Sequence, residues 1–501
     1  MILSILAVSS RTATVLLAPE GAAYRLAEDL AYSLVATNGT VIRSGTTRTV
    51  ALHFTGLAPD TPYNLLTARG EVSFRTCACD GLQNLKDLGI DADAEDNAAL
   101  IQQAIDSLPE NGTLVVPPGT YRSGPLFLKS RMTLHLETGA ELAAISDWQH
   151  WPILPAHDDE GRPLGTWEGL PADSFAALIN AIGCSGLSLT GDGTLDGGGD
   201  RGDWWSWPKQ TRRGARRPRT VFLAHCDNVE LSGLTVRNSP SWTIHPFRCT
   251  NLRAAALRIQ NPPDSPNTDG LNPESCEHVT LTGLHFTVGD DCIAVKAGKR
   301  EGTRTGHLAP CRNLTISHCM MERGHGAVVL GSEMSGDITD VLIRNCEFSG
   351  TDRGLRIKTR RGRGGKVARI SMSDVRMDKV ATAVSANAFY FCDEDGTSDA
   401  VQSRTPSPVD TGTPAIESIR VVNVTATNVQ LAAVALLGLP EAPITGFRIE
   451  NMRVSFDPDA LPDVPLMASR VPPCRHETVL CEFAEISGGI SLLNEDLCDA
   501  D

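Results

Sequence analysis

Short runs in which apolar and polar residues alternate fill most of the 501-residue chain, and this period-two pattern predicts β-strands. One block of such runs lies in residues 1–77. Segments 12–17 and 49–54 alternate in this way, and turn signals such as Asn38-Gly39 separate the runs. The pattern predicts a small all-β domain that ends near Thr76.

The end of this block carries a distinctive turn motif. Leu57, Pro59, Thr61 and Tyr63 form a Leu-x-Pro-x-Thr-x-Tyr arrangement. It resembles the tyrosine corner of fibronectin type III domains, in which the tyrosine hydroxyl bonds to the backbone a few residues upstream. The resemblance implies a fibronectin type III-like β-sandwich over residues 1–77, which would either bind a partner or act as a spacer. Since no exposed aromatic cluster is visible in the sequence, we favour the spacer.

The hydrophobic period changes to that of a helix only once, between residues 82 and 108. The apolar residues that recur there at helical spacing are Leu100, Ile101, Ala104, Ile105 and Leu108. Asp96 is placed to cap the start of this amphipathic helix, and Pro109 and Gly112 end it. After it the strand pattern returns for the rest of the chain.

From Cys184 onward the chain contains an internal repeat. Units of alternation open with the phrases Cys226-Asp-Asn-Val, Cys249-Thr-Asn-Leu, Cys276-Glu-His-Val, Cys311-Arg-Asn-Leu and Ile338-Thr-Asp-Val. Their spacings of 23, 27, 35 and 27 residues suit one turn of a solenoid. A unit of this size cannot bury its own apolar face, so the units must stack. We therefore predict a right-handed parallel β-helix over residues 82–470, with the helix capping its first coil and 471–501 forming a tail.

The fourteen cysteines and the net charge of −15 restrict the kind of protein. Cysteines that open successive units would stack as buried free thiols, and no spacing suggests a metal site. An acidic chain is not expected to bind nucleic acid, and no apolar run is long enough to span a membrane. Because the N-terminus reads as a strand without a basic leader, we expect a cytoplasmic location, with a secreted or periplasmic one as the alternative.

Three carboxylates, Asp269, Asp290 and Asp291, lie in or beside segments that otherwise read as strands. Aspartate is depleted in strands because its short polar side chain competes for the backbone. Ordinary turns also contain Asp, Asn and Gly, which is the alternative interpretation of both segments. If the three groups share one site, their repulsion would keep one protonated beside ionised neighbours, as cleavage of a glycosidic bond requires.

The repeat register favours the shared site. Asp290 lies 14 positions after Cys276, and His325 lies 14 positions after Cys311, so stacked coils bring the two together. Arg356 and Lys358, two residues apart in a strand, point to the same side. The glycines on both sides of His325 are expected to leave room for a ligand. Acids, a histidine and two cations would thus line one face of four neighbouring coils.

In these residues the chain resembles the polygalacturonases of glycoside hydrolase family 28, which have the pectin lyase-like β-helix fold. The four motifs that carry the resemblance occur in the family's order as Asn267-Thr268-Asp269-Gly270, Gly289-Asp290-Asp291, Gly324-His325-Gly326 and Arg356-Ile357-Lys358. The resemblance covers roughly residues 82–460. It implies inverting hydrolysis of α-1,4 bonds between galacturonates, with no cofactor and no metal ion.

The same resemblance implies a role for each motif residue. Asp290 would be the general acid, and Asp269 and Asp291 would activate the water. His325 would support the acid and the leaving group. The residues expected to bind the substrate are Asn267, Arg356, Lys358 and Tyr390.

Within this family the chain looks most similar to exo-acting bacterial enzymes, which often carry a fibronectin type III module. Insertions at 145–175 and 199–219, rich in Trp, Pro and Arg, could close one end of a groove so that only a chain end enters. Other interpretations remain open at this point. They are hydrolysis of a decorated pectin such as rhamnogalacturonan or xylogalacturonan, a calcium-dependent lyase, and a β-helix that only binds. The sequence leaves the oligomeric state open.

Overall fold

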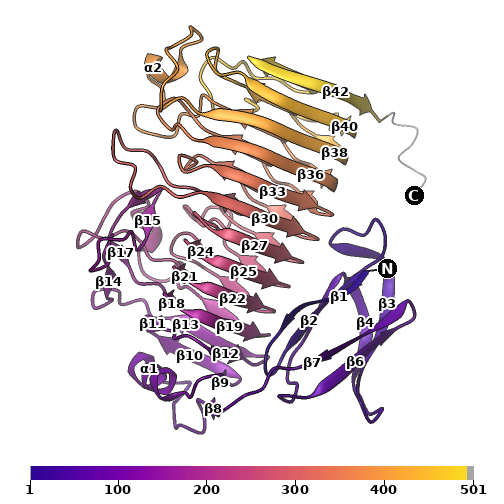
Figure 1. Ribbon diagram of the computed structural model, residues 1–501, viewed down its shortest axis with the longest axis vertical. Helices are drawn as coiled ribbons and strands as arrows, with labels where there is room; N and C mark the ends of the chain where they lie inside the picture. Colours follow the sequence, from indigo (N-terminus) through magenta and orange to yellow (C-terminus); the bar gives the residue numbers. More distant parts are fainter. Residues whose placement is uncertain (1, 494–501) are drawn as a thin grey trace.

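The computed structural model describes residues 2–493 as a stack of coiled strands with a small sandwich at its side (Figure 1). The predicted all-β architecture, a parallel β-helix preceded by small antiparallel sheets, is confirmed. Helical structure is confined to α1 (Ala98–Ser107), the 3₁₀ turn η1 (Trp204–Ser206) and α2 (Asp399–Gln402) in this part of the chain.

The N-terminal part forms two antiparallel sheets. One consists of β1 (Ile2–Val8), β2 (Ala13–Ala18) and β5 (Ala51–Phe54), and the other of β4 (Val41–Thr49), β3 (Arg25–Ala36), β6 (Pro62–Thr67) and β7 (Gly70–Arg75). Val15, Leu34 and Leu65 are fully buried between them. The Tyr63 hydroxyl accepts a hydrogen bond from the Ala58 N–H at 3.0 Å, as a tyrosine corner requires.

The β-helix is built from parallel strands that pair with the coil before and after. Its largest sheet comprises β8 (Leu82–Asn84), β9 (Gly112–Val116), β10 (Gly119–Ser123), β12 (Met132–Leu136), β13 (Ala140–Ala144), β19 (Ser185–Gly191), β20 (Thr194–Asp196), β22 (Asp227–Ser232), β23 (Thr235–Arg237), β25 (Thr250–Ala255), β26 (Arg258–Gln260), β27 (Glu277–Thr282), β28 (His285–Thr287), β30 (Cys311–Ser317), β31 (Met320–Arg323), β33 (Ile338–Arg344), β34 (Glu347–Ser349), β36 (Lys366–Asp378), β38 (Ala415–Val429), β40 (Ile444–Phe456) and β42 (Ala484–Leu492).

The remaining strands close the coils or lie in insertions. A four-stranded sheet contains β11 (Leu126–Phe127), β18 (Ile179–Ile182), β21 (Val221–Ala224) and β24 (Ile244–Phe247), and a six-stranded sheet contains β29 (Ile293–Val295), β32 (Val328–Gly331), β35 (Arg353–Lys358), β37 (Thr382–Asn387), β39 (Ala432–Leu437) and β41 (Glu477–Glu482). The two insertion hairpins are β14 (Ile153–Leu154) with β17 (Ser174–Phe175), and β15 (Thr166–Trp167) with β16 (Leu170–Pro171).

Inward-facing residues stack from coil to coil to make one continuous core. Leu252 pairs with Val279, Val279 with Leu314, and Leu314 with Val341, and all four are buried. The cysteines that open the repeat units are buried in the same core as free thiols: Cys226, Cys249, Cys276 and Cys311. The repeat therefore reflects stacking, as predicted from its spacing.

Helix α1 covers the open first coil, as expected, and buries Ile101 and Ile105. Its start differs from the prediction, because the N-cap residue is Asn97 and not Asp96. The Asp96 carboxylate still accepts hydrogen bonds from the N–H groups of Ala98 (2.9 Å) and Gly124 (3.0 Å). It thereby ties the helix start to the first coils instead of serving as a simple cap.

The C-terminal segment differs more. Residues from 471 onward were expected to form a tail, yet β41 pairs with β39 and β42 pairs with β40, so the solenoid continues to Leu492. The last strands were missed because they are largely exposed and carry charges where core strands carry apolar residues. The final part of the expected tail, 494–501, lies outside the described residues.

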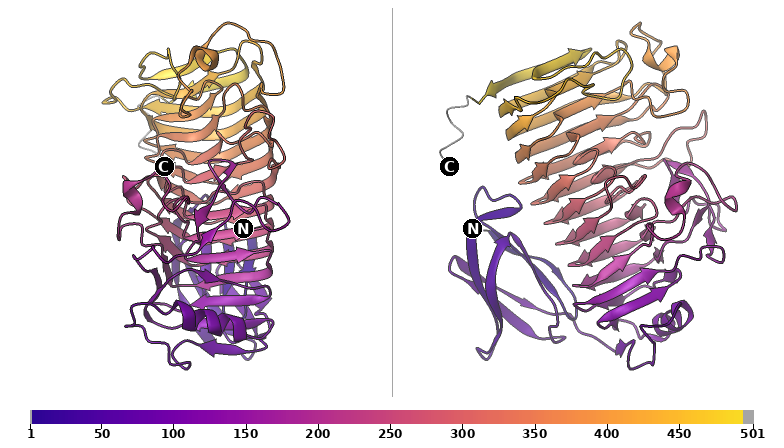
Figure 2. Two further views of the ribbon diagram at one scale, coloured as in Figure 1. Left: turned by 90° about the vertical axis from the view of Figure 1, so that its left-hand side faces the viewer. Right: turned by 180° about the vertical axis from the view of Figure 1, so that it is seen from behind.

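The N-terminal sandwich lies along the flank of the β-helix opposite the insertions that contain β14–β17 (Figures 1 and 2). Hydroxyl groups join the two parts, since Ser10 Oγ lies 2.7 Å from Thr113 Oγ1 and Thr12 Oγ1 lies 2.8 Å from Thr190 Oγ1. The sandwich is thus docked on the solenoid and does not hold it at a distance, in contrast to a spacer.

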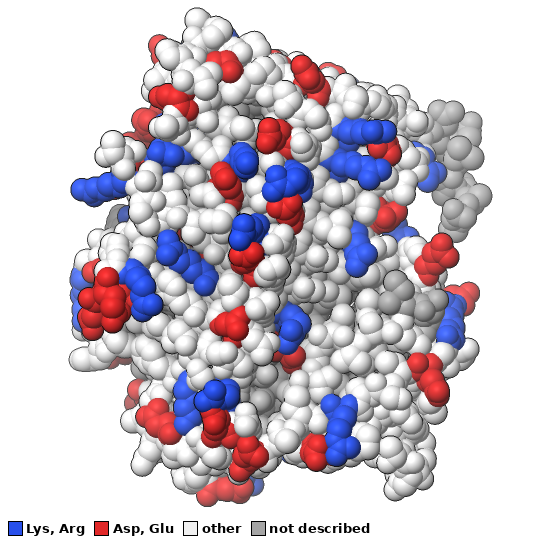
Figure 3. Space-filling model, viewed as in Figure 1, with Lys and Arg blue, Asp and Glu red and all other residues white. Residues whose placement is uncertain are grey.

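The surface in the view of Figure 3 carries acidic and basic side chains interspersed with one another. An anionic ligand would therefore need a local group of cations. No helix within residues 2–493 is long and apolar enough to cross a membrane.

Candidate active site

Parallel β-bridges between adjacent coils align the motif residues at equivalent positions of successive coils. The paired residues of this ladder are Ile244, Leu271, Ile293, Val328 and Leu355. Asp269, Asp291 and Gly326 each lie two residues before a member of this ladder. The Gly270 N–H accordingly donates to the carbonyl of Asp291 at 2.9 Å. Residues more than twenty positions apart are thus brought into one site by register alone.

The glycines of the Gly-His-Gly motif allow this stacking, and the expectation that they also leave room for a ligand stays a prediction. A Cβ on Gly324 would lie 2.6 Å from the carbonyl oxygen of Asp290. A Cβ on Gly326 would lie 2.4 Å from Val329 and 3.1 Å from Oδ1 of Asp291. The missing side chains therefore let the coil with Asp290 and Asp291 approach the coil with His325.

A cleft of about 270 Å³ opens where these coils meet. Its lining contains all eight residues that the sequence singled out, namely Asn267, Asp269, Asp290, Asp291, His325, Arg356, Lys358 and Tyr390. Other residues complete the lining: Glu168, Lys209, Trp242, Lys296, Ser332, Glu333, Cys392, Asp393 and Met467. Among the residues 2–77 that the structure describes in the N-terminal sandwich, none lines the cleft.

Asp291 is held by two cations of strand β35, which lies two coils further along the stack, beyond the coil of His325. Its Oδ1 lies 3.2 Å from Nη1 of Arg356 and its Oδ2 lies 2.8 Å from Nζ of Lys358. Leu355 and Ile357, which alternate with these cations along the strand, turn into the core. Burial alone would raise the pKa of Asp291, but the Lys358 ammonium and the Arg356 guanidinium outweigh it and hold the pKa well below its usual range.

Asp269 has a different environment. Its side chain is buried, and its Oδ2 accepts one hydrogen bond from Nδ2 of Asn272 at 2.8 Å. Burial, and next the repulsion from Asp290, raise the pKa of Asp269 well above its usual range. Two stacked carboxylates of the same cleft are therefore driven in opposite directions, one towards the protonated and one towards the ionised form.

Asp290 is the most exposed of the three acids and contacts His325. Its Oδ1 lies 3.3 Å from Nδ1 of His325 and accepts the N–H of Asp291 at 2.9 Å. The contact with Asp290 raises the pKa of His325 to about 9 in spite of partial burial. His325 is thus a cation at neutral pH, and it lies beside the acid that faces the open part of the cleft.

The remaining predicted residues are fixed by partners that the sequence did not reveal. The Oδ1 of Asn267 accepts a hydrogen bond from Nη2 of the buried Arg217 at 2.6 Å, which leaves the amide NH₂ free to point elsewhere. The Tyr390 ring lies 5.3 Å from Nζ of Lys358 and 5.9 Å from Cζ of Arg356. The tyrosine therefore covers the two cations that hold Asp291.

Sequence reasoning missed several lining residues. Lys296 directly follows strand β29, which comes after Asp290-Asp291, and Glu333 lies in the loop after β32. Both looked like ordinary charged residues at the ends of strands. Only the register, which pairs Val295 with Leu330 in the adjacent coil, could have shown that they meet.

A sequence model of the glycosyl hydrolases family 28 matches residues 114–462, a range that contains all eight predicted residues. A probable polygalacturonase of Vitis vinifera is 33% identical over 366 residues, which are 72% of this chain and 71% of that protein. An endo-polygalacturonase of Pectobacterium parmentieri is 27% identical over 311 residues, covering 60% of this chain and 73% of that one. Among solved structures, the family 28 exopolygalacturonase of Yersinia enterocolitica superposes with a TM-score of 0.69 at 20% identity over 98% of both chains.

Proposed function

Since the chain belongs to glycoside hydrolase family 28, we propose that it hydrolyses the α-1,4 bonds of polygalacturonate or its oligosaccharides with inversion, releasing residues from a chain end. The observation that carries the proposal is the joint presence of three aspartates, a protonated histidine and the pair Arg356–Lys358 in one cleft. Acids perform the hydrolysis, and cations select an anionic sugar.

Asp290 is assigned the role of proton donor to the leaving oxygen. It is the most exposed of the three acids, and the cationic His325 beside it can stabilise the carboxylate that remains when Asp290 gives up its proton. Inverting glycosidases place a water between the sugar and the base, on the side opposite the acid. Asp269 and Asp291, stacked one above the other, are assigned to hold and deprotonate this water.

The uronate carboxylate is assigned to Arg356 and Lys358. Both cations already contact Asp291, and both are nearly buried, so a second carboxylate that reaches them would meet little competition from solvent. A guanidinium offers two parallel donors to a carboxylate, and the ammonium adds a third. Tyr390 limits how the sugar can enter above them.

The exo mode is supported by a wall at one end of the cleft. Hairpin β15–β16 of the first insertion carries Glu168 into the lining, and Lys209 comes from the second insertion. The hairpin is anchored because the Trp167 ring stacks on Trp242 at 5.8 Å and the Gly169 carbonyl accepts the N–H of Lys299 at 2.9 Å. This wall is fixed to the solenoid and is not a loose loop.

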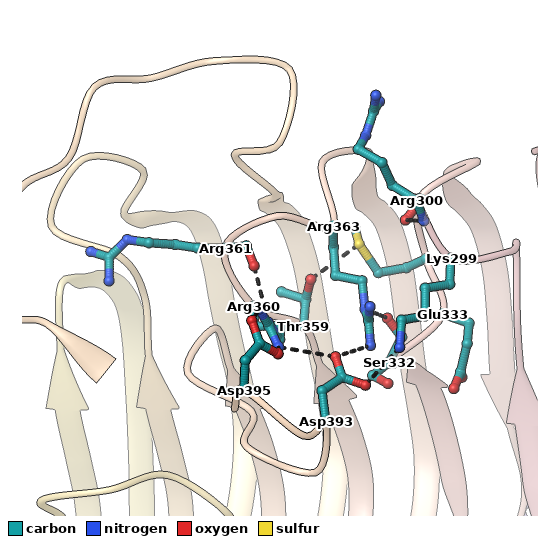
Figure 4. Close-up of polar contacts among 12 residues, drawn as sticks. Lys299, Arg300, Ser332, Glu333, Thr359, Arg360, Arg361, Arg363, Asp393 and Asp395 are labelled. Atoms are coloured by element: carbon teal, nitrogen blue, oxygen red, sulfur yellow. Dashed lines mark hydrogen bonds and ion pairs between the residues drawn. The ribbon is translucent and has the colours of Figure 1, made fainter. Parts of the chain in front are cut away.

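A second wall is formed by the loop that follows β37. Asp393 of this loop lines the cleft and is bound by Lys299 at 2.8 Å, Arg363 at 2.7 Å and Arg360 at 3.1 Å (Figure 4). Arg360 also contacts Asp395 in the same loop. A cleft bounded by such walls admits the end of a chain more readily than its middle.

Product analysis on a defined, undecorated oligogalacturonide tests the proposal. Release of monomer alone from the earliest time points is the expected result, and a ladder of intermediate lengths would contradict the exo mode. If no reducing sugar is released from this substrate but a rhamnogalacturonan or xylogalacturonan is cleaved, the substrate assignment is wrong. An unsaturated product that absorbs in the ultraviolet would replace hydrolysis by elimination.

A further inference from the structure

Lys296 and Glu333 form an ion pair inside the cleft that the reaction scheme above leaves unused. The Nζ of Lys296 lies 3.0 Å from Oε2 of Glu333, and the two side chains are only 5% and 9% exposed. A buried ion pair contributes little net stability, because the loss of hydration offsets much of the attraction. Its presence among catalytic carboxylates therefore calls for an explanation in terms of the site.

The ammonium of Lys296 is fixed in position from two sides. Glu333 follows strand β32 in the next coil, and the Trp242 ring centroid lies 4.8 Å from Nζ. Burial would lower the pKa of Lys296, but the charges of Glu333 and then Asp269 outweigh this and raise the pKa above its usual range. Lys296 thus pairs with Glu333 and lines the same cleft as Asp269, where its positive charge acts on that carboxyl group.

Asp269 needs such a cation more than Asp291 does. Asp291 has two ion pairs of its own, whereas the described chain contains no ion pair to Asp269 within 4.0 Å, and an amide is its hydrogen-bond partner. Burial and Asp290 favour the protonated form of Asp269, and Lys296 is the strongest influence in the opposite direction. A protonated Asp269 cannot accept a proton from water.

We propose that Lys296, held in place by Glu333, is a positioning residue that favours the ionised form of Asp269, so that Asp269 can deprotonate the attacking water. The inference rests on the role given to Asp269 in the proposed function. Glu333 weakens this effect, because its negative charge lies next to the ammonium and offsets part of the positive charge that acts on Asp269. The pair thereby sets the pH above which the base is available.

Other charged groups near this pair also affect the ionisation of Glu333 and Asp269. Lys358 and then Arg363 join Lys296 in lowering the pKa of Glu333, to about 2, against the effect of burial. Asp290 and Asp291 act on Asp269 from the next coil. On the other side, buried His245 has its pKa lowered to about 4 by burial, with Arg219 and Lys296 opposing the bond to Glu274, so it is neutral when the enzyme works.

The test is the pH dependence of kcat/KM on a defined oligogalacturonide, measured for the wild type, Lys296→Met, Glu333→Gln and the double variant. On the acid side, activity rises with pH as the base loses its proton. Removing the cation should move this rise to higher pH by about one unit, and removing the anion should move it to lower pH. In the double variant, which removes both charges, the rise should occur at a pH between those of the two single variants.

Displacement of the acid-side rise in opposite directions by the two single variants supports the inference. If the variants only lower kcat/KM and leave the pH of the rise unchanged, the pair is purely structural and the inference is overturned. Lys296→Arg, which keeps the charge, should keep the position of the rise, and Lys379→Met on the exposed surface serves as the matched control. Circular dichroism and thermal unfolding identify any variant that fails to fold, in which case Glu333→Gln and the double variant carry the test. If the wild type itself does not cleave the substrate, the proposed function fails and not this inference alone.

Discussion

The Nζ of Lys358 lies 2.8 Å from Oδ2 of Asp291, although the two residues are 67 positions apart in the chain. They lie two coils apart and meet across Gly326 of the coil between them, and both side chains are nearly buried. In the proposed function the same lysine also binds the substrate carboxylate. Binding of the uronate and ionisation of Asp291 would then depend on one cation.

Replacing Lys358 by Met should impair both functions. Loss of a charged hydrogen bond is expected to raise KM for an oligogalacturonide by about 10- to 100-fold, and the unbalanced Asp291 should become easier to protonate, which lowers kcat at acidic pH. Steady-state kinetics at two pH values measure both effects. Lys379→Met, outside the cleft, is the control, and equal kinetics of the two variants would exclude this role of Lys358.

Asp290→Asn should abolish most turnover while the fold is kept. An amide cannot protonate the leaving oxygen, and loss of a general acid typically costs about 10² to 10⁴ in kcat. The comparison is Asp264→Asn, a change of the same kind at an exposed aspartate that does not line the cleft. Wild-type turnover by Asp290→Asn would show that the cleft binds without catalysis or that another group donates the proton.

We expect activity to decline at alkaline pH as His325 loses its proton. Its pKa is raised to about 9 by Asp290, so the protonated form that supports the acid is complete at neutral pH and is lost as the pH rises through that value. His325→Gln should lower kcat at neutral pH and remove this alkaline decline. The exposed His278→Gln should retain it. A decline near pH 9 that persists in His325→Gln would assign it to another group.

Asp393→Ala should loosen the wall formed by the loop after β37. Removal of the carboxylate releases Lys299, Arg360 and Arg363 at once, and longer products are expected to appear beside the monomer. Asp395→Ala removes a neighbouring contact to Arg360 without changing the cleft lining, so it should still yield monomer. Chromatography of early products distinguishes the two. Monomer alone from Asp393→Ala would mean that this wall does not set the mode of attack.

Docking of the N-terminal sandwich should weaken in acid. His135 of the β-helix is buried beneath it, 3.5 Å from Thr55 Oγ1, and burial, then Arg11 and His53, lower its pKa to about 3. An undocked histidine takes up a proton near pH 6.5, so stability is lost progressively below that pH, by up to about 3 kcal/mol near pH 4.

Hydrogen exchange of β5, corrected for intrinsic rates, should show this loss in the wild type and a smaller loss in His135→Asn, because burial also lowers the pKa of His53 in β5 to about 4. His278→Asn is the control, since His278 is a histidine of the β-helix that is exposed to solvent. Equal protection of β5 at pH 7 and pH 4 in the wild type would contradict the account.

The sequence was most informative where one coil repeats the next. Counting from Cys276 and Cys311 predicted that Asp290 and His325 meet, because register in a stacked fold converts sequence position directly into height. Such counting cannot reveal burial. Lys296 and Glu333 were missed because a charged residue at the end of a strand is usually solvated, and these two are not.

The end of the solenoid could not be predicted for a related reason. The terminal strands β41 and β42 cover the stack on one side only, so their outer residues face solvent and the apolar pattern fades. Docking of the N-terminal sandwich was also missed, because polar contacts such as the hydroxyl pair Thr12–Thr190 contribute to it. Polar contacts of this kind leave no periodic signal.

The most direct test of the account is the configuration of the first product. Proton NMR during hydrolysis of an α-1,4 oligogalacturonide distinguishes the two anomers before they equilibrate. With Asp290 as the acid and a water held by Asp269 and Asp291, the new reducing end should appear first as the β anomer. Initial formation of the α anomer would require a covalent intermediate and would contradict this arrangement of the three aspartates.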